Sequence, residues 1–423
     1  MKQQGHYDYI FTGLGASSCI LIHELHRKGL LTQKKVLVLD PSNKTVNDKT
    51  YCFWSKDSDE ITQDFSSLAS HSWSKISIDN LPAQDIGDLK YYHINSLDLY
   101  NSAKKILADY KAIILKEAVL DIFSDHKTSV VSTSGKYTGE SIFDARPPTV
   151  QETLPEDQNI LQSFIGYKIK LKDETLNPDA CTLMNFNVAQ QGHTQFVYVL
   201  PFSENTALVE LTRFGTEAIS ENGSKEILET YIKEHFGAYE LTDIELGVIP
   251  MYMDLKSPKP IDGVVPIGTR ANKVKPSTGY AFKNMHAHAK SICAEHRDNK
   301  TATRFRLYDR LLILILAVWP HQGKPIFQRL FRVRDTAYVL KFLDEKTTIW
   351  DDMKMFSKLP IAIFLRSCVA LMMRKAKPAM FLFGPILLYF LLESFVPIVT
   401  EYVMYGVLIV GLIPVSYTHL RAH

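Results

Sequence analysis

The sequence has little net charge and few cysteines. Its 423 residues carry 48 Lys and Arg against 46 Asp and Glu, a formal net charge of +2. A chain this close to neutral has no strong electrostatic attraction to nucleic acid, so no nucleic-acid partner is expected. The 5 cysteines show neither CxxC nor any other metal-ligand spacing. They indicate a reducing compartment and argue against a zinc site, and no metal is predicted.

A cleavable signal sequence is also lacking, because the first residues pass directly from a short polar segment into a strand-like run and a glycine loop. We therefore expect the body of the protein in the cytoplasm. Long apolar runs are missing except near the end, where residues 379–414 carry Glu393 and Glu401 as their only charges. A membrane helix needs about 20 mainly apolar residues. Residues 374–415 are thus predicted to associate with membrane lipid, as a span, a hairpin or interfacial helices.

Four basic residues near the start of this segment would keep that flank at the cytoplasmic face of the membrane: Arg366, Arg374, Lys375 and Lys377. A buried helix pair is the alternative, because Pro385 and Pro397 interrupt the apolar run. The final residues, 416–423, fit no periodicity and are expected to be non-native.

The strand and helix signals predict an α/β protein. Residues 7–40 read as strand, glycine loop, helix and strand, which is typical of a Rossmann dinucleotide-binding domain. Short alternating runs between about 160 and 255 predict an inserted antiparallel sheet, and residues 300–373 have a helical period. We predict a first part of the nucleotide domain at 1–150, a substrate domain at 151–260, a closing part at 261–298, a helical cap at 299–373 and the apolar tail at 374–415.

The glycine loop predicts a nucleotide-binding site. Gly13, Gly15 and Ser18 occupy the three positions of G-x-G-x-x-G, with the last glycine replaced. The two glycines allow a tight turn and a close approach to pyrophosphate at a helix N-terminus, and the third position needs only a small side chain. Asp40 ends the next strand, where an acid accepts hydrogen bonds from a ribose. An ordinary β-α turn is the alternative reading.

A second loop late in the chain points to a flavin. The stretch "KVKPSTGYAF" and the "IGT" before it would bring backbone N–H groups to a flavin ring and its ribityl arm. A simple helix start with Ser277 or Thr278 as N-cap is the alternative. The cofactor-binding residues predicted in this region are Gly268, Thr269, Lys275, Pro276, Ser277, Thr278 and Gly279.

An aromatic run, "NDKTYCFW", follows the strand that ends at Asp40. Most aromatic clusters belong to a protein core. Here Tyr51, Phe53 and Trp54 are predicted instead to line a flat apolar substrate pocket, where their ring faces would attract a cation.

One carboxylate stands in a strand that should be buried. In "TALVELTRF", alternation places Ala207, Val209 and Leu211 on one face and Glu210 on the other. An exposed glutamate is the ordinary reading. The alternative is that Glu210 points into an apolar cavity, where its pKa would rise and it could transfer protons.

Together these stretches resemble the lycopene cyclase family of flavin-dependent carotenoid enzymes. The resemblance covers most of residues 7–290 and rests on "TGLGASS" with Asp40, "NDKTYCFW", "DARP", "LQSFIGYKI", "TLMNFNVAQ", "FVYVLPFSENTALVELTRF", "ELGVIPM" and "GTRANKVKPSTGYAF". It implies a glutathione-reductase-like fold, FAD that is active in its reduced form, and NADPH or NADH as reductant.

The resemblance also implies the reaction and its catalytic residue. The ψ-end groups of lycopene, or of another acyclic carotenoid, would be cyclised to β-rings with no net redox change. The catalytic acid of the family's F-L-E-E-T-like pattern falls on Glu210. The chain departs from the family at Leu211, Asn185 and Ser163, which replace an acid, an acid and a histidine. A flavin-dependent reductase or hydroxylase and a non-catalytic carotenoid-binding protein are the alternatives.

Overall fold

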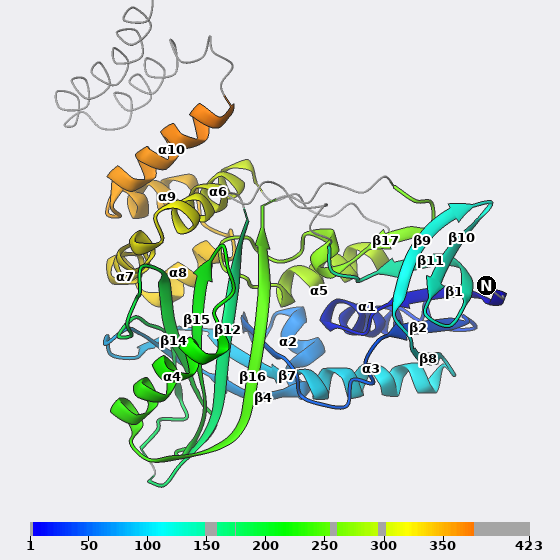
Figure 1. Cartoon of the computed structure of the whole chain (residues 1–423), viewed down its shortest axis with the longest axis horizontal. Helices are drawn as coiled ribbons and strands as arrows, with labels where there is room; N and C mark the ends of the chain where they lie inside the picture. Colours follow the sequence, from blue (N-terminus) through cyan, green and yellow to red (C-terminus); the bar gives the residue numbers. More distant parts are fainter. Residues whose placement is uncertain (1–2, 149–158, 174, 254–259, 295–301, 376–423) are drawn as a thin grey trace, which may run out of the picture. The chain divides into compact units, whose positions relative to one another are not determined.

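The computed structural model describes residues 3–148, 159–173, 175–253, 260–294 and 302–375. The chain forms two compact units, residues 1–360 and residues 361–423. Three sheets and most of the described helices belong to the first unit (Figure 1). In the second unit the described residues form α10 (Ile361–Lys375).

The first sheet is the predicted nucleotide-binding layer. Its parallel strands are β8 (Ile113–Lys116), β2 (Val36–Asp40), β1 (Gln3–Thr12), β11 (Lys136–Asp144) and β17 (Val264–Pro266), and β10 (Lys127–Ser132) and β9 (Val119–Asp125) extend it antiparallel. β2 is buried along its whole length, as expected where both faces of a parallel strand are covered. Helix α1 (Ala16–Arg27) connects β1 to β2 and contacts α3 (Ser96–Asp109) and α5 (Phe282–Cys293).

The second sheet has the order β16-β12-β15-β14-β13-β5-β6. Its strands are β16 (Tyr239–Tyr252), β12 (Asn159–Leu171), β15 (Thr206–Gly215), β14 (Thr194–Pro201), β13 (Ala180–Asn185), β5 (Lys75–Ile78) and β6 (Gln84–Asp85). The sheet is antiparallel except where β13 pairs with β5 in parallel. β5 and β6 thus extend the inserted sheet, although they lie in the part of the chain predicted for the nucleotide domain, residues 1–150.

The two faces of the second sheet are covered by different helices. Helix α4 (Glu221–Phe236) packs on the face that carries Ala207, Val209 and Leu211. On the opposite face, Phe327 of α7 (Gly323–Val333) contacts Phe214. The other cap helices are α6 (Thr303–Val318), α8 (Thr336–Leu343) and α9 (Ile349–Phe356), with the short η5 (Pro320–Gln322). Glu210 therefore points away from α4.

A small third sheet carries the aromatic run. It consists of β3 (Thr50–Lys56), β7 (Leu89–Asn95) and β4 (Ala69–Trp73), with α2 (Glu60–Phe65) and η1 (Ser66–Leu68) between β3 and β4. β3 contacts α5 of the first layer, and Thr50 bonds to β16 of the second. The α/β class, with a parallel layer, an inserted largely antiparallel sheet and helices after it, is confirmed.

In the described part of the chain, no single helix is long and apolar enough to cross a membrane. One pair of helices, Ile349–Phe356 with Ile361–Met372, meets that condition only when taken together, by length and composition alone. The predicted apolar tail, 374–415, falls almost entirely outside the described residues, as does 416–423.

Candidate active site

The glycine loop joins β1 to α1 with the geometry that a phosphate requires. Gly13 has φ +119°, a backbone conformation that favours glycine. Gly15 is the N-cap of α1, and no side chain caps that helix. A Cβ atom added at Gly15 would meet nothing within 4 Å, so open space lies in front of the helix N-terminus. Uncapped N–H groups facing open space fit a phosphate group.

Ser18 and Asp40 support this loop. The Ser18 side chain is fully buried, in agreement with a packing position. Asp40 ends β2, and its carboxylate accepts hydrogen bonds from the N–H groups of Leu14, at 2.7 Å, and Ser42, at 2.8 Å. A carboxylate can accept about four hydrogen bonds, so Asp40 can fix the loop and still accept from a ribose hydroxyl.

The late loop meets the glycine loop. Gly268 begins the short helix η4 (Gly268–Ala271), which also contains Thr269, and has φ +63°. A Cβ atom at Gly268 would lie 2.5 Å from the Oγ atom of Ser17, in the first turn of α1. The two loops predicted to bind one nucleotide are therefore in contact, although about 250 residues separate them in sequence.

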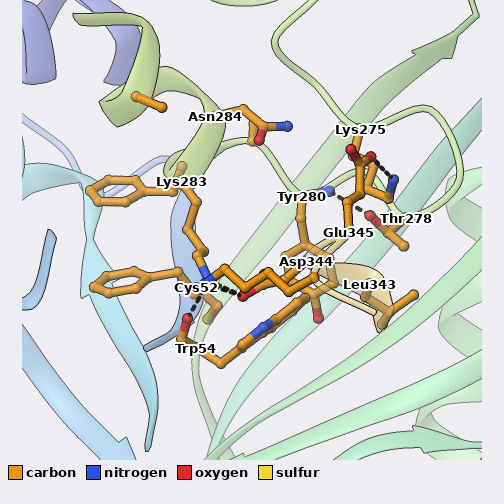
Figure 2. A pocket seen from close by; sticks show the side chains of 15 residues that line it. Cys52, Trp54, Lys275, Thr278, Tyr280, Lys283, Asn284, Leu343, Asp344 and Glu345 are labelled. Atoms are coloured by element: carbon orange, nitrogen blue, oxygen red, sulfur yellow. Dashed lines mark hydrogen bonds and ion pairs between the residues drawn. The ribbon is translucent and has the colours of Figure 1, made fainter. Parts of the chain in front are cut away.

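The segment from Lys275 to Gly279 lies further along, at the second sheet. Lys275 forms an ion pair with Glu345, at 2.5 Å (Figure 2), and a second one with Asp309, at 3.3 Å. Gly279 has φ +72°, and a Cβ atom there would lie 2.2 Å from Oε1 of Gln162 on β12. Pro276, Ser277 and Thr278 form the turn between them.

Helix α5 begins at Phe282, with Ala281 as its N-cap. The alternative in which Ser277 or Thr278 caps this helix is therefore wrong. The turn at residues 276–278 ends before the helix starts, and Gly279 and Tyr280 between them belong to no helix or strand.

A pocket of about 240 Å³ opens between this loop, β3 and the residues that follow α8 (Figure 2). Trp54, Thr278 and Tyr280 are among its lining residues. At its wall, the ammonium group of Lys283 donates to the carbonyl oxygen of Trp54, at 2.9 Å, and pairs with Asp344, at 2.5 Å. The pocket thus joins the nucleotide layer, the aromatic strand and the helical cap.

The predicted aromatic trio is divided between the two faces of β3. Phe53 stacks on Phe282, with ring centroids 5.1 Å apart and planes at 7°, and Tyr51 packs against the same ring. Trp54, on the other face, packs on Tyr280 in a T-shaped arrangement, with ring centroids 4.7 Å apart. Phe53 and Trp54 both contribute to the pocket lining, and so does Cys52. Tyr51 lies with the core of the first layer instead, because strand alternation turns it towards α5.

Glu210 lies on the face of the second sheet that is turned away from α4, and its partners in the register are Tyr198 of β14 and Gly166 of β12. The hydroxyl of Thr212 donates to its Oε1 atom at 2.9 Å. The pKa of Glu210 is raised to about 8, first by burial and then by the negative charge of Glu245, and the Thr212 hydrogen bond opposes this shift. Glu210 is therefore a carboxyl group that keeps its proton at neutral pH.

Tyrosines surround this carboxyl group. The hydroxyls of Tyr91 and Tyr280 lie 3.3 Å apart, and Tyr280 is also hydrogen-bonded to Tyr198. Burial holds the pKa of all three phenols well above the usual range, so they stay neutral. Tyr198, Tyr280, Cys52 and Glu210 are only half-buried, although burial dominates the pKa shift of each. They therefore border an internal space.

Sequence reasoning missed Glu245. This residue lies on β16, and Gly166 is its partner in the sheet register, as it is for Glu210. The signal was present, because "TDIELGVIP" places an acid between two apolar residues of a strand. The sequence alone does not show that β15 and β16 both pair with β12, and it is this pairing that brings Glu245 near Glu210.

The three departures from the family pattern have structural roles here. Leu211 is fully buried beneath α4, on the face opposite Glu210. Asn185 donates to the hydroxyl of Tyr231 at 2.8 Å, and Ser163 accepts from the N–H group of Ile219 at 2.9 Å. Over the described ranges, no group of three or more His, Cys, Asp and Glu side chains is arranged to hold a metal ion.

Comparison with solved structures shows the fold. A geranylgeranyl bacteriochlorophyll reductase-like protein from Thermoplasma acidophilum has a TM-score of 0.53 at 13% identity, over 86% of this chain and 99% of its own. HpxO from Klebsiella pneumoniae, determined as a variant complexed with FAD, has a TM-score of 0.54 at 12% identity, over 81% and 98%. The flavin-dependent brominase Bmp2 has a TM-score of 0.52 at 15% identity, over 88% and 100%. The fold is that of FAD-dependent flavoproteins.

Sequence comparison gives the family. The chain is 24% identical over 305 residues to a lycopene beta-cyclase of Pseudescherichia vulneris, which covers 69% of this chain and 74% of that protein. The family model described as lycopene cyclase protein matches residues 8–368. The chain therefore belongs to the lycopene cyclase family.

Proposed function

We propose that this protein cyclises the ψ-end groups of lycopene, or of another acyclic carotenoid, to β-rings, with Glu210 as the catalytic acid. The observation that carries this proposal is a half-buried carboxyl group whose pKa is raised by burial and whose neighbour in the sheet register is Tyr198. The reaction is an isomerisation. One proton adds to the terminal double bond, the next double bond closes the ring onto the cation, and another proton leaves.

An alkene is a very weak base, so its protonation needs an acid that is kept away from water, because water would take the proton first. Burial keeps Glu210 in its protonated form at neutral pH and excludes water from the reacting atoms. The Thr212 hydroxyl, at 2.9 Å, holds the carboxyl group in one orientation. After proton transfer, the Glu210 carboxylate is a negative charge beside the new cation.

Aromatic side chains supply a second source of stabilisation. Tyr198 is the cross-strand neighbour of Glu210, and Tyr280 links it to Trp54. Ring faces attract a cation by about 0.5–2 kcal/mol each. Neutral phenols do not trap the cation as phenolates would, which agrees with the raised pKa values of these tyrosines.

The residues of the first layer fit FAD. The uncapped N-terminus of α1 and Gly15 would take the pyrophosphate, Asp40 the ribose, and the loop from Gly268 to Gly279 the flavin end. When bound, reduced FAD would supply negative charge near the substrate cation, after its reduction by NADPH or NADH, and no electrons would pass to the product.

We also propose that the protein works at the cytoplasmic face of a membrane. The substrate is wholly apolar and dissolves in lipid, and residues 379–414 carry only two charges. An apolar tail at the bilayer would bring the pocket to the lipid that holds the substrate.

Pigment analysis of lycopene-accumulating cells tests the reaction. Cells that express the parent chain should contain γ-carotene or β-carotene, and cells that express Glu210→Gln should retain lycopene. Glu240→Gln is the matched control, because Glu240 is an exposed glutamate on β16. Unchanged lycopene with the parent chain would overturn the proposal. Consumption of nicotinamide in proportion to product would favour a reductase or hydroxylase instead.

A further inference from the structure

Four residues form one row across the second sheet. The register pairs Tyr198 with Glu210, Glu210 with Gly166, and Gly166 with Glu245. Residues paired in this way project from the same face, so both carboxyl groups lie on the face opposite α4. Their Cα atoms are two strand spacings apart, about 10 Å. The residue between them has no side chain.

The missing side chain at position 166 matters for the space between the two acids. A Cβ atom there would lie 2.9 Å from Cδ1 of Leu208 and 3.5 Å from Cβ of Glu210. Any larger residue would therefore displace Leu208 and enter the gap. Glycine at position 166 leaves room for the Leu208 methyl group and the Glu210 stem above the strand that separates the two acids.

We infer that Glu245 is a second carboxylate of this site, a positioning residue that carries the negative charge of the pair and so leaves the proton on Glu210. The inference deepens the proposed function and rests on it for its catalytic meaning. Glu245 would not touch the substrate, and it would act only through Glu210.

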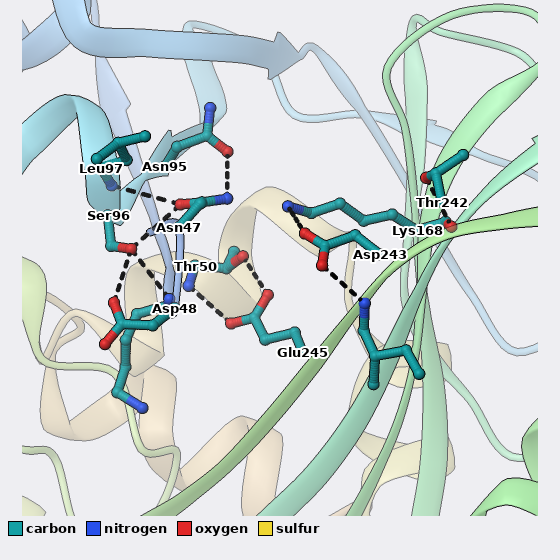
Figure 3. A network of polar contacts seen from close by, with 12 residues as sticks. Asn47, Asp48, Thr50, Asn95, Ser96, Leu97, Lys168, Thr242, Asp243 and Glu245 are labelled. Atoms are coloured by element: carbon teal, nitrogen blue, oxygen red, sulfur yellow. Dashed lines mark hydrogen bonds and ion pairs between the residues drawn. The ribbon is translucent and has the colours of Figure 1, made fainter. Parts of the chain in front are cut away.

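The hydrogen bonds decide which acid of the pair is charged. Glu245 is only 6% exposed, and it accepts from the N–H group of Thr50 at 2.8 Å and from the Thr50 hydroxyl at 2.7 Å (Figure 3). Glu210 accepts one hydrogen bond, from Thr212. Two donors stabilise a carboxylate better than one, so Glu245 ionises first.

The charged and titratable neighbours agree with this assignment. Lys168 and Lys49 act on Glu245 and favour its charged form, whereas burial raises its pKa. Around Glu210, the neighbours are Tyr198, Cys52 and Glu245, and the causes of its raised pKa include no basic group. Among the described residues, basic groups therefore act on Glu245 and none acts on Glu210. Since like charges repel, a charged Glu245 keeps Glu210 neutral.

Thr50 ties this pair to the pocket. It is the first residue of β3, the strand that also carries Cys52 and Trp54. Glu245 reaches from the edge strand of the second sheet to the third sheet through these two hydrogen bonds (Figure 3). The charge that controls Glu210 is thus fixed to the strand that lines the pocket.

Infrared difference titration of the purified, flavin-loaded full chain tests the inference. The carbonyl stretch of a protonated carboxyl group is read against pH, and the band that disappears in Glu210→Gln belongs to Glu210. Glu245→Gln should lower the midpoint of this band by about one pH unit or more, a tenfold change in the ratio of protonated to ionised Glu210. Glu240→Gln should leave the midpoint unchanged.

A second variant guards against misfolding of the first. Thr50→Val removes one donor from Glu245 but keeps the backbone N–H group, and it should shift the midpoint in the same direction by a smaller amount. An unchanged midpoint in both variants, with normal flavin absorbance, would overturn the inference. The titration needs no turnover. If the parent chain forms no cyclic product but the midpoint still responds to Glu245→Gln, the proposed function fails and the coupled pair stands.

Discussion

Gly268 lies against Ser17, so that a methyl group on Gly268 would approach the Ser17 hydroxyl to 2.5 Å. This contact joins the first turn of α1 to a loop that arrives after the whole inserted sheet. The nucleotide site is therefore complete only when both parts of the first layer have folded together.

Gly268→Ala should accordingly weaken flavin binding. The substitution combines the cost of a left-handed backbone, φ +63°, with a clash at α1. We expect most of the bound flavin to be lost. The measurement is the ratio of flavin absorbance, at about 450 nm, to protein absorbance, at about 280 nm. Gly29→Ala is the matched control, because Gly29 has φ +70° and open space around it. Equal flavin loss in both variants would contradict the packing argument.

Asp40→Asn should reduce flavin affinity by roughly 10- to 100-fold, since hydrogen bonds to charged groups contribute about 1.5–3 kcal/mol. The Asp40 carboxylate both fixes Leu14 in the glycine loop and remains available to a ribose. Titration of the apoprotein with FAD, followed by flavin fluorescence, gives the dissociation constant. An unchanged constant would show that Asp40 does not contribute to the nucleotide site.

Glu210 should make the protein less stable as the pH rises. Its pKa is raised from 4.5 to about 8 in the folded protein, so between these values the folded state binds more protons than the unfolded state. The free energy of unfolding therefore falls with rising pH in this window, by at most about 1.4 kcal/mol per pH unit. Glu210→Gln lacks this effect. Its thermal midpoint should exceed that of the parent by a margin that grows with pH, and a margin independent of pH would contradict the raised pKa.

Tyr280 should contribute through its ring more than through its hydroxyl. Its ring packs on Trp54 in a T-shaped arrangement, with ring centroids 4.7 Å apart, and its hydroxyl bonds to Tyr91. Tyr280→Phe should retain most of the cyclisation rate, whereas Tyr280→Leu should lose about 3- to 30-fold, the equivalent of one lost cation–π contact. Initial rates at equal flavin content make the comparison. Equal rates for the two variants would place the Tyr280 ring outside the cation's reach.

The sequence predicts best those features that depend on residues close together in the chain. The β-α-β unit is visible because glycines 13 and 15 stand between a strand and a helix, and Glu210 is visible because its strand is otherwise apolar. What depends on strand pairing is harder to predict. Glu245 joins the site only through the register of β16, β12 and β15, and β5 joins the second sheet by a parallel pairing across about 100 residues.

The aromatic run shows how the period of a strand distributes neighbouring side chains. Tyr51 and Phe53 share one face of β3, and Trp54 lies on the other, as alternation requires. That all three line one substrate pocket stays a prediction; Phe53 and Trp54 line the pocket beside Lys283, and Tyr51 is not among its lining residues. Cys52 shares the face of Trp54 and lines the pocket, while Tyr51 bonds to Tyr100 in the core of the first layer.

The central claim is that Glu210 donates the proton that starts ring closure. Its most direct test is the reaction of the purified, flavin-loaded protein with lycopene in D₂O, with Glu210→Gln and Glu240→Gln beside the parent. We predict cyclic product carrying one added deuterium per ring from the parent and from Glu240→Gln, and a rate at least about 100-fold lower from Glu210→Gln. Cyclic product from Glu210→Gln at the parent's rate would contradict the claim.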